Sequence, residues 1–124
     1  MLLCQVDMLA NFAHLLNVKI PANAAPDSEN HLNAWLNKNG KGREYLVLQN
    51  VQNNLSIENG QWKYIAPGPG PAYGKETNSE YGNLKEDQLY DLAVDKVEKS
   101  NVASKNPNIL NSLKSTLEAI KSAK

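Results

Sequence analysis

The stretch that decides the fold is Leu55-Ser56-Ile57-Glu58-Asn59-Gly60-Gln61-Trp62-Lys63-Tyr64-Ile65. Apolar and polar residues alternate on both sides of Asn59-Gly60, which is the period of a β-strand. Asn-Gly is the favoured pair for a two-residue type I′ turn, because both positions of that turn need positive φ. The stretch therefore predicts a β-hairpin with strands at 55–58 and 61–65. Trp62 and Tyr64 share one face of it, where we expect core packing.

Further elements follow on either side of this hairpin. The residues 44–49 and 88–92 predict two more strands. The segment 66–87 begins with alternating proline and glycine and continues with polar residues, and loops of that length are usually functional or disordered. After Asn106-Pro107, apolar residues at spacings of three and four from Ile109 to Ile120 predict a helix.

The N-terminal residues show helical patterns instead. Leu9, Phe12, Ala13 and Leu16 fall on one stripe of a helix predicted over 6–17, with Asp7 as its cap. Leu2-Leu3-Cys4 indicates the end of a buried strand. A short helix is predicted over about 29–37, capped by Asp27 or Ser28. We therefore expect an α+β fold in which a small antiparallel sheet of three to four strands (43–124) carries a C-terminal helix on one face and follows N-terminal helices (1–42).

Composition excludes several classes of protein. A chain of 124 residues fits one small domain. Thirteen basic and thirteen acidic residues leave no net charge, which gives no case for nucleic acid or an anionic membrane as partner. The single cysteine, Cys4, excludes an internal disulfide and a cysteine-based zinc cluster. No apolar run approaches the ~20 residues that cross a bilayer.

Five residues are candidates for contact with a ligand. Tyr73, Lys75, Asn78 and Tyr81 lie in the long loop, where tyrosine rings can stack on a sugar and a lysine can meet a sulfate or carboxylate. His31 lies in the short helix, and its imidazole can serve as a ligand or an acid–base group. We find no phosphate-binding glycine loop, metalloprotease motif or paired-carboxylate spacing.

The stretch QLYDLAVDKVEKSNVA (88–103) carries Asp95, Glu98 and Asn101 at spacings of three. These side chains are either a polar site or a corner between a strand and the next helix. We favour the corner, because Asp and Asn side chains bond nearby backbone N–H groups and hold tight turns.

Five stretches form an ordered set of motifs: Cys4–Ala13, Ala25–Ser28 with Leu32 and Leu36, Arg43–Val47, Leu55–Ile65 and Gln88–Ala103. In this order they resemble the C-terminal part of the sulfatase family, hydrolases of sulfate esters. Two positions depart from the family pattern: Glu58 stands where arginine is usual, and Lys96 where proline is usual.

The resemblance implies a fragment of a longer protein, with Met1 inside it. Residues 1–42 would lead in from the catalytic domain, and the sheet would pack against that domain and line one wall of the substrate pocket. The family uses calcium and a formylglycine made within Cys/Ser-x-Pro/Ala-x-Arg. This sequence contains no such motif, so the resemblance places both groups outside the fragment, which we expect to be inactive alone.

The expected partner is the missing N-terminal catalytic domain, with self-association of the fragment through its exposed docking face. No nucleic acid or membrane partner is expected, and the resemblance implies a periplasmic or secreted location. Two alternatives stay open: a stand-alone saccharide-binding module that uses the 66–87 loop, and a protein-interaction module.

Overall fold

The computed structural model describes residues 1–123, which form two compact units, Met1–Glu44 and a second that begins at Tyr45. The second unit contains a four-stranded antiparallel sheet and the first is helical, so the α+β class is confirmed.

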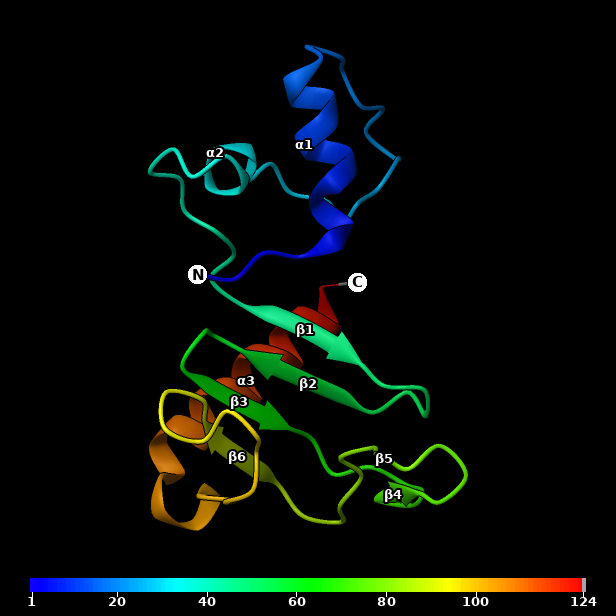
Figure 1. Cartoon of the computed structure of the whole chain (residues 1–124), viewed down its shortest axis with the longest axis vertical. Coiled ribbons are helices and arrows are strands. Elements are labelled where there is room, and N and C mark those ends of the chain that lie inside the picture. The colour runs from blue at the N-terminus through cyan, green and yellow to red at the C-terminus, as the bar shows by residue number, and fades with distance from the viewer. Residues whose placement is uncertain (124) are drawn as a thin grey trace. The chain divides into compact units, whose positions relative to one another are not determined.

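The sheet of the second unit has the order β1-β2-β3-β6, from β1 (Leu46–Gln49), β2 (Leu55–Glu58), β3 (Trp62–Ile65) and β6 (Gln88–Asp91). One row of paired residues crosses all four strands: Val47, Ile57, Tyr64 and Leu89. Helix α3 (Pro107–Ser122) covers this face (Figure 1) and adds Leu113 and Leu117 to the core. The short 3₁₀ helix η2 (Ala103–Lys105) leads into it. The predicted core role of Tyr64 is confirmed, and Trp62 packs against the same core.

The turn between β2 and β3 differs from the predicted type I′ turn. Positive φ occurs at Gly60, at 92°, and not at Asn59. The backbone N–H of Asn59 donates to the carbonyl of Trp62, so the two-residue loop is Gly60-Gln61, with glycine first as in a type II′ turn. The turn therefore lies one residue later in the chain than predicted, because the Asn59 Oδ1 accepts the backbone N–H groups of Gln61 and Trp62.

The segment 66–87, predicted as a loop, contains a second small hairpin of β4 (Tyr73–Gly74) and β5 (Ser79–Glu80). Asparagines fasten this hairpin to the sheet. The amide of Asn50, after β1, donates to the carbonyl of Tyr81 and to Oδ1 of Asn83, both at 2.8 Å. Asn83 is buried and donates in turn to the carbonyl of Pro71. The hairpin is therefore held from both of its ends.

The first unit contains the 3₁₀ helix η1 (Gln5–Asp7), α1 (Met8–Leu15) and α2 (Leu32–Trp35). The predicted strand at Leu2-Leu3-Cys4 is wrong, since only an isolated bridge pairs Leu2 with Arg43. The predicted caps are also wrong. Asp7 makes no cap hydrogen bond, and the hydroxyl of Ser28 accepts the backbone N–H of Ala10 in the first turn of α1 at 3.0 Å.

Candidate functional site

The face of the sheet opposite the core row of Val47, Ile57, Tyr64 and Leu89 forms the floor of a hollow of about 690 Å³. Its walls are the β4–β5 hairpin and the corner after β6. The floor mixes polar, aromatic and aliphatic side chains, which face the hollow because successive side chains of a strand point to opposite faces. The main lining residues are Ser56, Lys63, Ile65, Gln88 and Tyr90 from the strands, Tyr73, Glu80 and Tyr81 from the hairpin, and Lys96, Val97 and Glu98 from the corner.

Four of the predicted ligand-contact residues come together on the small hairpin. Tyr73 and Tyr81 line the hollow. The Tyr73 hydroxyl donates to Oδ1 of Asn78, and the hydroxyls of Tyr81 and Thr77 lie 3.0 Å apart. Lys75 is exposed in the turn between the two strands. Their contact with a ligand stays a prediction.

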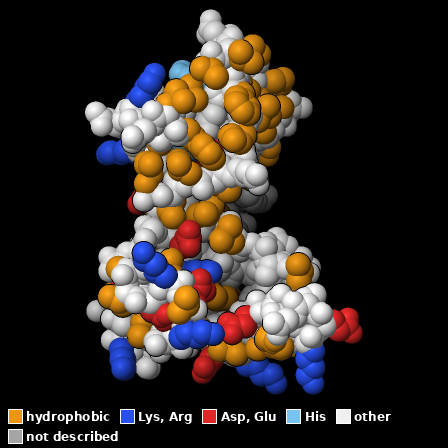
Figure 2. Space-filling view, viewed as in Figure 1, with side chains coloured by type: hydrophobic (Ala, Val, Ile, Leu, Met, Phe, Trp, Pro, Cys, Tyr) orange, Lys and Arg blue, Asp and Glu red, His pale blue; other side chains and the backbone are white. Residues whose placement is uncertain are grey.

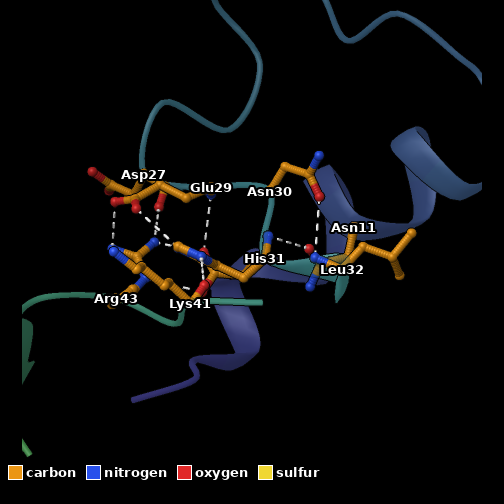
Figure 3. Close-up of polar contacts among 9 residues, drawn as sticks. Asn11, Asp27, Glu29, Asn30, His31, Leu32, Lys41 and Arg43 are labelled. Carbon is orange, nitrogen blue, oxygen red and sulfur yellow. Dashed lines mark hydrogen bonds and ion pairs between the residues drawn. The ribbon is translucent and has the colours of Figure 1, made fainter. Parts of the chain in front are cut away.

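The fifth predicted residue, His31, lies in the first unit and not on this hairpin. Figure 3 shows it between two oxygens: Nδ1 lies 2.9 Å from the Lys41 carbonyl and Nε2 lies 3.0 Å from Oε2 of Glu29. Its side chain is 14% exposed. Both ring nitrogens are thus engaged inside the unit, which is a structural arrangement, and a ligand role for His31 stays a prediction.

The cluster around His31 is organised by Arg43, the single arginine of the chain (Figure 3). Its Nε and Nη2 donate to the two carboxylate oxygens of Asp7 at 2.9 and 2.6 Å, and Nη1 donates to Glu29 at 2.8 Å. Nη2 also donates to the carbonyl of Asp27 at 2.5 Å. The guanidinium therefore joins the start of α1 to the segment before α2.

Asp7 is fully buried in this cluster. Burial acts to raise the pKa of its carboxyl, but the hydrogen bonds from Arg43 and from the backbone of Glu29 prevail and hold the pKa below its ordinary value. This pair was not predicted from the sequence, because Asp7 and Arg43 are far apart in the chain and Asp7 fits the pattern of a cap. One feature of the sequence could have indicated the pair: Arg43 is the single arginine of the chain.

The stretch 88–103 forms a corner, as predicted. Oδ2 of Asp95 accepts the backbone N–H of Ser100 at 2.8 Å, and backbone hydrogen bonds lower the pKa of this carboxyl. Oδ1 of Asn101 accepts the N–H groups of Leu89 and Ala103, both at 3.0 Å. Glu98 pairs with Lys63 at 2.8 Å, which ties the corner to the floor of the hollow.

Among residues 1–123 no group of three His, Cys, Asp or Glu side chains is placed to hold a metal ion. The side chains of this part of the chain therefore do not fit the calcium that the resemblance implies, and the sequence has no motif that fits the formylglycine. In the same residues no helix is both long and apolar enough to span a membrane.

The chain is related to the sulfatase family and corresponds to a C-terminal part of such a protein, as the motifs predicted. N-acetylgalactosamine-6-O-sulfatase of Bacteroides thetaiotaomicron is 47% identical to it over 120 residues, which cover 97% of this chain. The chain spans about a quarter (24%) of that relative's length. No family model matches the chain.

Solved structures agree in fold. One, from work on the metabolism of multiple glycosaminoglycans by Bacteroides thetaiotaomicron, has a TM-score of 0.87 at 46% identity and covers 94% of this chain and 24% of that one. The crystal structure of Ps i-CgsB has a TM-score of 0.62 at 20% identity and covers 91% of this chain and 23% of that one. At that identity the second match concerns the fold alone.

Proposed function

We propose that this chain is the C-terminal part of a sulfatase that hydrolyses sulfate esters, with 6-O-sulfated N-acetylgalactosamine as the substrate class. The observation that carries the proposal is the 47% identity over 97% of the chain to a protein of that named activity. In the whole enzyme the chain has two roles: it packs against the catalytic part, and it supplies one wall of the substrate pocket.

The wall that we propose is the β4–β5 hairpin with the hollow beside it. Three observations support this: Tyr73 and Tyr81 line the hollow, Lys75 is exposed in the turn, and Asn78 lies beside the Tyr73 hydroxyl. A tyrosine offers an apolar ring with a polar end, and a lysine offers a compact positive charge for an anionic sugar. Asn50 and Asn83 hold the hairpin in place, which suits a surface that has to position a substrate.

Calcium and formylglycine chemistry would come from the catalytic part of the enzyme, since the described residues fit neither group. We accordingly propose that the chain alone does not hydrolyse sulfate esters. A periplasmic or secreted location of the whole protein is part of the same proposal and follows the sulfatase relationship.

A chimaera tests the proposal. In it, this chain replaces the 120 matched residues of the Bacteroides thetaiotaomicron sulfatase. We expect the chimaera to release sulfate from 6-O-sulfated N-acetylgalactosamine, and the isolated chain to release none above background. A chimaera that is folded by circular dichroism but inactive would overturn the proposal.

The hairpin is tested inside the active chimaera. Tyr73→Ala and Lys75→Ala should raise KM or lower kcat/KM while leaving Tm unchanged, because both side chains are exposed. Lys85→Ala, another exposed lysine of the same segment, is the matched control. Kinetics unchanged in all three variants would contradict the pocket wall. A clear hit of the isolated chain on a glycan array would instead favour a stand-alone saccharide-binding module.

A further inference from the structure

Helix α1 and its flanks turn their apolar side chains outward. Six large apolar residues in this stretch are each more than half exposed: Val6, Leu9, Phe12, Leu15, Leu16 and Val18. Three of them, Leu9, Phe12 and Leu16, belong to the apolar stripe that the spacing of three and four predicted. A surface helix of a globular protein normally shows the reverse arrangement, with its apolar stripe toward the core.

Polar bonds fix this orientation. The inward face carries Asp7, Ala10 and Asn11, all buried. Three hydrogen bonds tie that face to the segment 28–31: Glu29 N to Asp7 Oδ1 at 2.9 Å, Ala10 N to the Ser28 hydroxyl at 3.0 Å, and His31 N to Asn11 Oδ1 at 2.8 Å. Rotating the helix to bury the apolar stripe would break all three bonds. The outward stripe is therefore built into the unit.

The chemistry of the stripe indicates what it contacts. Asp7 is the only acidic or basic residue between positions 6 and 18, apart from His14, and it is buried on the opposite face. Figure 2 shows hydrophobic side chains gathered over the unit that contains α1. Contiguous apolar patches of this kind mark interaction sites on soluble proteins. The partner surface must therefore be apolar as well.

We infer that the apolar face of α1 docks on the remaining part of the same sulfatase polypeptide, an inference that rests on the proposed function. The chain spans 24% of its sulfatase relative, so about three quarters of such an enzyme lies outside it. Covalent linkage gives that part a high effective concentration at the stripe, which favours it over a separate partner.

The test compares one substitution in two settings. Phe12→Glu places a charge at the centre of the stripe. In the chimaera defined above we expect Tm to fall by at least about 5 °C, because a docked phenylalanine is lost and a charge is buried. In the isolated chain we expect Tm to change by less than about 2 °C, because Phe12 is exposed there. Val51→Glu, at an apolar position that is more exposed still and lies in the second unit, is the control and should leave both proteins unchanged.

The outcomes separate the possible occupants. Equal losses of Tm in both settings would show that the stripe packs within this chain, and no loss in either would show that it stays in water. A dimer of the isolated chain that Phe12→Glu dissociates, with the chimaera unaffected, would assign the stripe to a second copy. Each of these results overturns the inference while an active unmodified chimaera upholds the proposed function. If Phe12→Glu prevents the chimaera from folding, Phe12→Ala provides the same comparison. An inactive unmodified chimaera overturns both.

Discussion

Replacing Asp7 with asparagine should destabilise the unit Met1–Glu44 by about 3–5 kcal/mol, the cost of removing one partner of a buried ion pair. The side chain of Asp7 is fully buried and that of Arg43 is 13% exposed. Asparagine keeps one acceptor oxygen, but its NH₂ group would face the donors of the guanidinium. Two charge-assisted hydrogen bonds, at 2.9 and 2.6 Å, are therefore at stake. At roughly 1.5–3 kcal/mol each, their loss would cost about 3–6 kcal/mol, which overlaps that range.

Two tryptophans, one in each unit, allow this unit to be followed by itself. In a Trp62→Phe background, urea unfolding monitored by the fluorescence of Trp35 reports the first unit. Glu29→Gln is the matched control. This substitution removes the second carboxylate that pairs with Arg43. Because Glu29 is 56% exposed, the loss of that ion pair should cost at most about 1 kcal/mol.

The pH dependence has a definite sign. Because the pKa of Asp7 lies below its ordinary value of 3.8, its contribution is fully present above that value and is lost as pH falls through the lower, folded-state pKa. Asp7→Asn should remove this part of the acid destabilisation. A cost of Asp7→Asn no larger than that of Glu29→Gln, or an unchanged acid profile, would refute this account of the cluster.

Two further predictions concern single side chains. Tyr64→Phe should cost about 1–2 kcal/mol in urea unfolding of the second unit, because the buried hydroxyl donates to Oδ1 of Asp87 at 2.7 Å; a cost equal to that of the exposed Tyr73→Phe would contradict the importance of that bond. Gly40→Ala should destabilise the first unit by about 1–3 kcal/mol, because a Cβ at this position would overlap the backbone of Ala34 in α2. Lys41→Ala is its control, and a cost within about 0.5 kcal/mol for both variants would show that α2 shifts freely.

The sequence by itself determined the four strands of the main sheet and the C-terminal helix of the second unit. The alternation around Ile57 and Tyr64 and the spacing from Ile109 to Ile120 are local patterns, and local patterns predict a strand or a helix directly. The order of five motifs was also enough to predict the sulfatase relationship. The length of the 66–87 loop and its residue types drew attention to Tyr73, Lys75, Asn78 and Tyr81. A loop sequence has no period, however, so the small hairpin that carries them was not predicted.

Only the tertiary structure decided which side chains meet. Arg43 reaches Asp7 across 36 positions of the chain, and Ser28 caps α1 from 18 positions away, while local spacing had suggested Asp7 as the cap. The orientation of α1 was decided in the same way, since three polar bonds hold its polar face inward and turn Leu9, Phe12 and Leu16 out. Hydrophobic periodicity predicts that a helix has an apolar face, but the contacts of the surrounding chain determine where that face points.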